Sequence, residues 1–253
     1  MENTTEKTLG AAEPAELTEP IDSTETAELT ETAKSMDMLK LMEQRHSVRR
    51  YTDKAIEPEK VQLLQAKIDW INAETGLVFK LFTEEPEAFK ANKPSYGSFK
   101  GCRNYFALGG RKGDDEKVGY YGEMLVLLAQ ELGLNTCWVA LTFEKSVVKK
   151  VFEDGVILFD VIALGYGEDG GVPHRSKAPE KLSNVTEDSP EWFKRGVEAA
   201  ALAPTAINQQ KFFLELKDGG VRAKAFIGPC YKTDLGIVKY HFEMGAGREI
   251  KWL

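Results

Sequence analysis

The sequence has few of the residues on which metal and disulfide sites depend. Its 253 residues include three cysteines (Cys102, Cys137 and Cys230) and three histidines. The cysteines are too few and too scattered for a disulfide framework. There is no C-x-x-C, and the histidines are far apart in the chain, so we expect no protein-ligated metal.

Long apolar runs are also missing. The N-terminus is acidic and lacks the apolar region of a signal peptide. The longest apolar helical pattern, near 118–134, contains Glu123 and Glu131 and does not resemble a membrane span. We therefore expect a cytoplasmic protein in a reducing setting, with no membrane partner.

The sequence also has no excess of positive charge. The formal net charge is −7, and all of it lies in residues 1–35, which hold nine acidic and two basic side chains. The rest of the chain is neutral, which argues against a nucleic-acid partner. The Thr/Glu/Ala-rich composition of 1–35 predicts a disordered tail, with a functional acidic arm as the alternative.

The remaining sequence alternates helical and strand patterns, which indicates an α+β fold. Helices are expected over 36–44, from Pro58, over 118–134, from Ser189-Pro190 to Pro204, and from Asp234, which would cap the last helix. Strands are expected at 77–82, 104–108 and 156–164, with a hairpin formed by 211–216 and 221–227.

The end of the chain repeats the order of its beginning. Pro58-Glu59 and Pro190-Glu191 each open a helix, a loop and a strand, at an offset of 132 residues. Later, both long helices run on to a tryptophan, Trp138 and Trp252. We favour an internal duplication; two unrelated helix-strand units of similar pattern are the alternative.

Four segments carry side chains suited to an anionic, flat ligand. In R-H-S-V-R-R-Y, 45–51, extended backbone would place Arg45, Ser47 and Arg49 on one face, where guanidinium groups suit a phosphate. Alone, the segment also fits a basic helix end.

The other three segments are individually ambiguous. G-L-N-T-C-W-V-A-L, 133–141, would let backbone N–H groups approach a ligand, or is a helix C-cap running into a connection. Arg175 and Lys177 alternate within 172–182, as in many solvated loops. A-P-T-A-I-N-Q-Q-K-F, 203–212, offers a hydroxyl and amides that suit a heterocycle edge, or ordinary turn chemistry.

Together, R-x-S-x-R, G-L-x-T-C-W, R-x-K and P-[ST]-x-x-N-x-Q resemble the FMN-dependent nitroreductase family over about 36–253, and in particular a branch with an altered order of segments. The resemblance implies a three-layer α/β/α fold with a central mixed, mostly antiparallel sheet flanked by helices. It also implies FMN at the interface of an intertwined homodimer.

In that family the P-[ST]-x-x-N-x-Q loop comes from the partner subunit and usually lies between the first helix and strand. Here 71–78 occupies that place without the motif, which appears at 204–210 instead. We therefore predict a fused pseudo-dimer that is a monomer in solution with one FMN per chain. Residues 36–185 would be copy one, and 186–253 a partial second copy.

The resemblance assigns roles residue by residue. Arg45 and Ser47, with Arg175 and Lys177, would bind the phosphate and ribityl groups, and Arg49 would reach the N1/C2 edge of the flavin. A backbone N–H near Ala140 or Leu141 would face N5. The full predicted FMN-binding set is Arg45, His46 (through its backbone), Ser47, Arg49, Trp138, Val139, Ala140, Leu141, Arg175, Lys177, Pro204, Thr205, Ala206, Asn208 and Gln210.

The sequence departs from the family at two places. Lys211 stands where proline is common, and Ala140-Leu141 replaces a frequent Gly-Gly or Glu-Gly. The implied activity is hydride transfer from NADH or NADPH through FMN to a nitroaromatic, quinone or similar small acceptor, with no catalytic side chain. The alternatives are a flavin-binding protein without turnover, for storage or sensing, and a dehydrogenase or dehalogenase on the same fold.

Overall fold

The computed structural model describes residues 37–90, 98–173 and 175–253. The predicted acidic tail, 1–35, lies outside the described residues. A helix over 37–44 opens the described chain, as its pattern predicts, and buries Met42.

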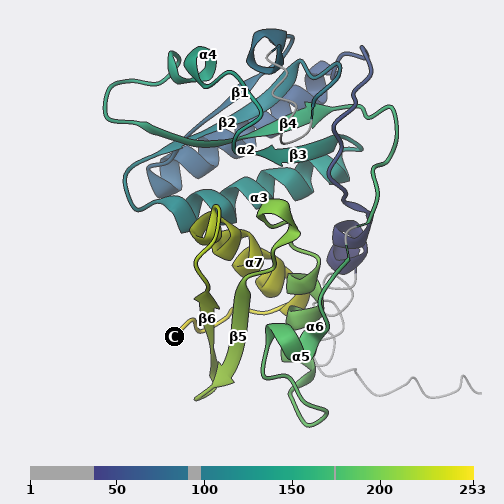
Figure 1. Cartoon of the computed structure of the whole chain (residues 1–253), viewed down its shortest axis with the longest axis vertical. Helices are drawn as coiled ribbons and strands as arrows, with labels where there is room; N and C mark the ends of the chain where they lie inside the picture. Colours follow the sequence, from purple (N-terminus) through teal and green to yellow (C-terminus); the bar gives the residue numbers. More distant parts are fainter. Residues whose placement is uncertain (1–36, 91–97, 174) are drawn as a thin grey trace, which may run out of the picture.

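A four-stranded antiparallel sheet organises the first half of the molecule (Figure 1). Its strands are β1 (Val78–Phe82), β2 (Asn104–Gly110), β4 (Ile157–Gly165) and β3 (Asn135–Val139), in that spatial order. The two central strands, β2 and β4, are apolar along most of their length because both of their faces are covered. A parallel bridge between Ser47 and Thr136 at the β3 edge makes the arrangement mixed.

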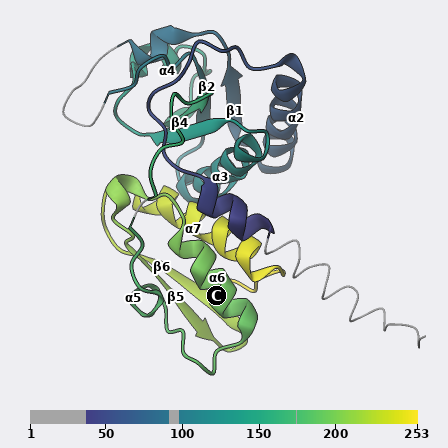
Figure 2. The same cartoon turned by 90° about the vertical axis from the view of Figure 1, so that its right-hand side faces the viewer.

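Helices cover both faces of this sheet. α2 (Pro58–Thr75) and α3 (Asp115–Glu131) bury their apolar stripes on one face, where Leu64 and Leu125 join the same core cluster as Ile162 of β4. The short helices η1 (Pro86–Phe89) and α4 (Lys145–Lys149) lie on the opposite face. Figure 2 shows α2 to the right of the strands and α3 below them. The predicted α/β/α fold class is confirmed.

The second half forms a smaller unit below α3 (Figure 1). Its elements are α5 (Pro179–Leu182), α6 (Glu191–Ala201), η3 (Ala206–Asn208), β5 (Phe212–Lys217), β6 (Gly220–Ala225) and α7 (Tyr231–Ala246). β5 and β6 pair as the predicted hairpin, joined by Asp218 and Gly219, both with positive φ. They form a separate two-stranded sheet.

The two units meet where α3 crosses α7 at a pair of glycines. A Cβ on Gly119 would lie 1.9 Å from the Thr233 carbonyl oxygen, and a Cβ on Gly236 would lie 1.9 Å from the Glu116 carbonyl oxygen. Each glycine therefore lets the backbone of the other helix approach closely, and the contact is reciprocal.

One local prediction is wrong, and one of the alternatives is excluded. Asp234 does not cap the last helix, since α7 begins at Tyr231 with Cys230 as its N-cap. Residues 135–139 are not a connection after a helix end, because they form edge strand β3, paired with β4 from Asn135↔Gly165 to Val139↔Val161.

Candidate functional site

The Arg45–Arg49 segment runs in extended form along the β3 edge. His46 donates from Nδ1 to the Gly170 carbonyl oxygen at 3.0 Å, and Arg50 pairs with Glu168 at 2.8 Å. These even-numbered side chains face the segment 167–171. The alternation of an extended chain then leaves Arg45, Ser47 and Arg49 on the other side, as the sequence predicts.

Those three side chains gather around Cys137 of β3. Burial raises the pKa of the Cys137 thiol, while the charges of Arg49 and Arg45 and the Ser47 hydroxyl lower it. The bridge between Ser47 and Thr136 fixes this register. The structure thus brings the cationic segment and the strand after the long helix together.

Arg45 carries the clearest sign of a missing partner. Its side chain is 4% exposed, and its Nε is buried with no hydrogen-bond partner among the described residues. The Nε2 of neighbouring His46 is likewise buried without a partner there. A buried guanidinium is costly to leave unpaired. An anion of phosphate type matches its donors, so this segment fits the phosphate end of FMN.

The 204–210 loop is clamped to Arg175 and Lys177. Asn208 and Gln210 donate from their side-chain amides to the Arg175 carbonyl oxygen, at 3.1 and 2.9 Å. Lys177 donates from Nζ to the carbonyl oxygens of Gln209 and Gln210, at 2.8 and 2.9 Å, and from its backbone N to the Gln210 side chain at 2.7 Å. The Arg175 side chain itself is exposed. The predicted late basic pair and the predicted loop therefore form one cluster.

This loop holds unusual backbone conformations. Ile207, Asn208 and Gln210 have φ values of 49°, 53° and 46°. Positive φ is tolerated by asparagine but is strained for a β-branched residue such as Ile207, whose side chain is 79% exposed. Strain of this kind persists where the surroundings over-determine the conformation, and it is concentrated at ligand sites.

The end of β3 presents backbone rather than side chains. The Trp138 ring packs against Gly122 of α3, and its Nε1 donates to Glu123 at 2.8 Å. Val139 is buried, whereas Ala140 and Leu141 follow the strand into solvent, Leu141 with 61% exposure. Of this predicted segment, the backbone at Ala140 and Leu141 is therefore the part open to a ligand.

The chain limits how far apart the two clusters can lie. A Cβ on Gly171 would lie 2.8 Å from His46 Cβ, which puts Gly171 against the cationic segment. Four residues further on, the Arg175 carbonyl holds the polar loop. Four extended residues span at most about 14 Å.

Pro204, Thr205 and Ala206 lead into the strained turn. The Thr205 hydroxyl accepts the Gln210 N–H at 3.0 Å, which closes the loop on itself. The Ala206 N–H donates to Asp234 of α7. Asp234 and Gln209 are absent from the predicted set. Asp160, a buried carboxyl on β4 whose pKa Asp234 raises, is also absent from it. Asp160 could have been found, since an acid inside the run V-I-L-F-D-V-I-A-L is unexpected.

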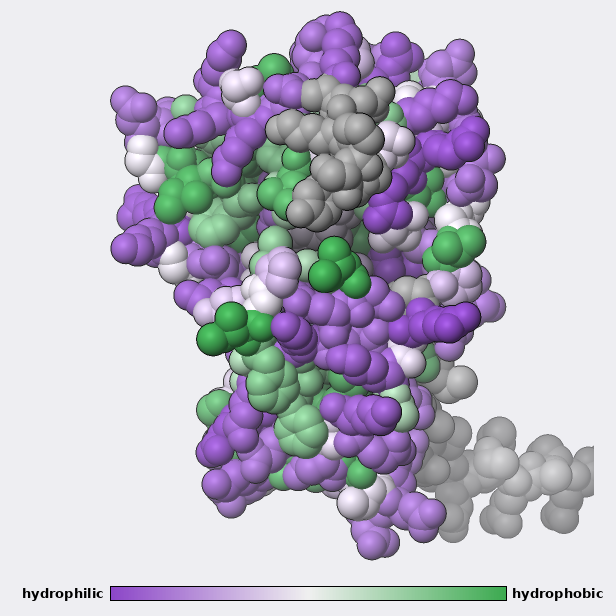
Figure 3. Space-filling view, in the orientation of Figure 1, coloured by the Kyte–Doolittle hydropathy of each residue, from purple (hydrophilic) through white to green (hydrophobic). Residues whose placement is uncertain are grey.

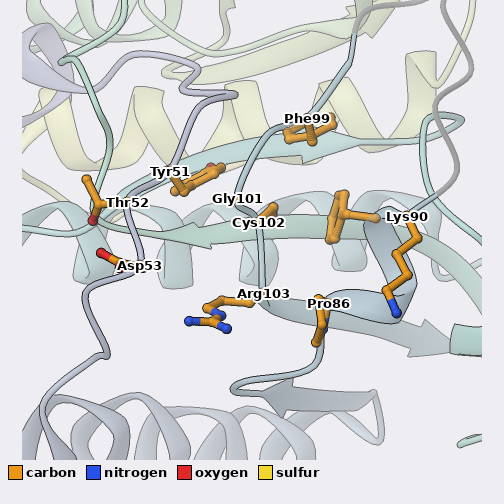
Figure 4. Close-up of a pocket in the computed structure, with 10 residues that line it drawn as sticks. Tyr51, Thr52, Asp53, Pro86, Lys90, Phe99, Gly101, Cys102 and Arg103 are labelled. Atoms are coloured by element: carbon orange, nitrogen blue, oxygen red, sulfur yellow. The ribbon is translucent and has the colours of Figure 1, made fainter.

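Two hollows in the surface lie elsewhere. One of about 360 Å³ is lined by residues that include Tyr51, Cys102 and Arg103, which Figure 4 shows around it. Another, of about 400 Å³, adjoins Trp192 and Arg248. No predicted FMN-binding residue lines either one. The predicted cluster instead lies on an open surface. Its set of donors and the unpaired Nε of Arg45 distinguish it better than the volume of a hollow does.

The surface of the molecule is mixed in character. Figure 3 shows a largely hydrophilic face with small, separate groups of apolar side chains. Across the described ranges, no helix has the length and apolar character needed to cross a membrane. Those same ranges hold no group of three or more His, Cys, Asp or Glu side chains arranged for a metal ion.

The class of protein is defined by three features. These are the α+β fold, the cationic segment on a sheet edge and the polar loop from a second unit. Residues 37–246 match the model of the family described as "Putative TM nitroreductase", and the chain belongs to that family. It is therefore an oxidoreductase of nitroreductase type.

The fold is shared with the crystal structure of a "putative nitroreductase" from Thermotoga maritima. That protein is 22% identical, the match covers 82% of each chain, and the TM-score is 0.59. A "putative nitroreductase in complex with FMN" from Desulfovibrio desulfuricans is 19% identical, with 60% of this chain and 98% of that chain covered and a TM-score of 0.45. No curated protein matches the sequence.

Proposed function

We propose that the protein is an FMN-dependent oxidoreductase that takes electrons from NADH or NADPH and reduces a nitroaromatic, quinone or similar small acceptor. The observation that carries the proposal is the buried, unpaired Nε of Arg45 beside Ser47 and Arg49. The membership of the nitroreductase family supports the same function.

The cationic segment would hold the cofactor. Arg45 and Ser47 would bind the phosphate, for which a guanidinium and a hydroxyl are well suited. Arg49 is exposed on the same side and would reach the pyrimidine edge of the ring. A cation there stabilises the negative charge that the reduced ring carries.

The second unit would complete the site. Thr205, Ala206, Asn208 and Gln210 would close over the cofactor, with Lys177 holding the loop in place. The exposed backbone at Ala140 and Leu141 would lie at the opposite side. Bound FMN would supply the redox chemistry, accepting a hydride from the nicotinamide and passing it to the acceptor.

We also propose that the chain is a fused pseudo-dimer, with 36–185 as copy one and 186–253 as a partial second copy. The repeated helix, strand, strand, helix order supports this, as does the reciprocal contact of Gly119 and Gly236. A monomer with one FMN per chain should result. The second site that a symmetric dimer would have should not bind FMN, because the second copy lacks an R-x-S-x-R segment.

The test of function is spectroscopic. Purified full-length protein, loaded with FMN and desalted, should show a flavin absorption spectrum, and anaerobic NADH or NADPH should bleach it. Protein that retains flavin but does not bleach with either donor would favour the binding function without turnover. Protein that cannot be loaded with FMN would overturn the proposal.

The test of the pseudo-dimer is stoichiometric. Flavin absorbance against protein concentration should give one FMN per chain, and light scattering of the same sample should give the mass of a monomer. Two flavins per chain, or flavin found only in a dimer fraction, would contradict the fusion.

A further inference from the structure

The first turn of α7 carries a buried carboxylate that is directed at the polar loop. Asp234 is 8% exposed and does not cap its own helix. Its two oxygens accept the Ala206 N–H at 3.0 and 3.2 Å, and Oδ2 also accepts from Gln209 Nε2 at 2.7 Å. Three contacts thus tie the helix to the loop.

We propose that Asp234 is a positioning residue for cofactor binding, which holds the 205–210 loop in the shape that closes over FMN. This inference rests on the proposed function. It concerns a residue outside the predicted cofactor-contacting set, which acts only through Ala206 and Gln209.

The placement of the contacts supports this role. Ala206 and Gln209 flank Ile207 and Asn208, two of the residues with positive φ. A strained turn keeps its shape only if its ends are held. Asp234 holds both ends at once, and Gln209 Nε2 further donates to the Pro229 carbonyl oxygen at 2.6 Å.

The loop is held from its other side by Lys177. Lys177 would also lie near the cofactor, so its loss would remove both a clamp and a positive charge. Asp234 separates the two effects, because a carboxylate is not a ligand for an anion. Any loss of FMN affinity on its removal would report on loop shape.

The burial of Asp234 makes the anchor sensitive to pH. Burial raises the pKa of Asp234 to about 6, while the hydrogen bonds from Gln209 and Ala206 oppose the rise. Asp234 in turn raises the pKa of Asp160 on β4, as Asp115 of α3 does, whereas Lys145 lowers it. These three carboxylates also raise the pKa of the Cys230 thiol. The ionised carboxylate is the better acceptor, so the anchor should weaken as the pH falls below about 6.

The experiment is an FMN titration of the full chain at pH 7.5, followed by flavin fluorescence. Asp234→Ala should weaken FMN binding about tenfold or more, and Asp234→Asn, which keeps one oxygen acceptor for Ala206, should weaken it less. The matched control is Asn184→Ala, which removes two hydrogen bonds to Leu216 in the same unit, at 2.8 and 3.1 Å, away from the loop. Asn184→Ala should leave FMN affinity within about twofold of wild type.

The second readout is the pH profile between pH 5 and 7.5. The wild-type protein should lose more FMN affinity on acidification than Asp234→Asn. The FMN phosphate titrates in both measurements, so the difference between them reports on Asp234. Asp234→Ala that binds FMN as tightly as wild type would overturn the inference. The inference would also be overturned if Asp234→Ala and Asn184→Ala lost FMN affinity in the same proportion to the fall in their melting temperatures. Wild type that fails to bind FMN would instead overturn the proposed function.

Discussion

The two units of the molecule share an order of elements but differ in one connection. Helix α2 has 18 residues and passes through Gly76 directly into β1, which begins at Val78. Helix α6 has only 11 residues, and 202–211 then lead to β5 at Phe212. The first strands stand 134 positions apart (212 − 78), close to the predicted offset of 132. The offset between the units is therefore nearly constant, although the second unit has a shorter helix and a polar loop in place of its last turns.

The interface between the units preserves a common pattern. In each unit a tryptophan donates from Nε1 to a glutamate of its own long helix: Trp138 to Glu123 at 2.8 Å, and Trp252 to Glu243 at 2.5 Å. The other oxygen of each glutamate is bonded to the opposite long helix, Glu123 to His241 and Glu243 to Tyr120. The units thus diverge in their loops while the contact between them stays symmetric.

The largest effect should come from breaking that symmetric contact. Gly119→Ala and Gly236→Ala each place a methyl group against a carbonyl oxygen of the opposite helix, so α3 and α7 must separate. We expect each to lower the free energy of unfolding by about 3 kcal/mol. Guanidinium unfolding followed by circular dichroism measures this. Gly170→Ala is the control, since its Cβ would meet nothing within 4 Å. Clearly unequal losses at Gly119 and Gly236 would argue against reciprocity.

The next effect concerns Asp160, which lies on the sheet of the first unit and is 6% exposed. Burial raises its pKa to about 7, Asp234 adds to the rise, and Lys145 opposes it. Because the raised pKa favours the protonated form in the fold, stability should fall as the pH rises from 5 to 8, by about 2–3 kcal/mol. Asp160→Asn should flatten this dependence in denaturant titrations. An unchanged pH slope in the variant would assign the dependence to other groups.

A smaller effect tests the two faces of the cationic segment. Arg49→Ala should weaken FMN binding about tenfold or more, because it removes a charge-assisted hydrogen bond to the cofactor. Arg50→Ala breaks only the exposed pair with Glu168 and should change affinity less than about twofold. Fluorescence titration compares them, and equal losses would contradict the assignment of faces.

The smallest effect tests the strain in the loop that only the second unit has. Ile207→Gly suits the positive φ and removes an exposed side chain, so it should stabilise the native backbone against its strain by up to about 1 kcal/mol. The greater freedom of glycine in the unfolded chain offsets part of this gain. Thermal unfolding should therefore show a small rise or no change, whereas a large fall would mean that Ile207 has a packing role.

Much of the fold could be predicted because it is local. The helical spacing of Leu64, Ile68 and Ile71 in α2, and the Asp-Gly-Gly turn of the hairpin, act within a few residues of themselves. The alternation that separates Arg49 from Arg50 is equally local. Strand β3 could not be found this way, because Asn135 and Thr136 resemble the end of a helix cap. Only pairing with β4 makes them a strand.

The sequence by itself determined most of the elements, their repeated order and the set of donors available to a cofactor, because propensity and periodicity are properties of neighbouring residues. The tertiary structure alone decided what Asp234 does. An acid in the first turn of a helix is ordinarily explained by the helix dipole. Here its partners are Ala206, 28 positions away, and Gln209, 25 positions away. Contacts at that separation exist only once the hairpin has folded back, so no local pattern can reveal them.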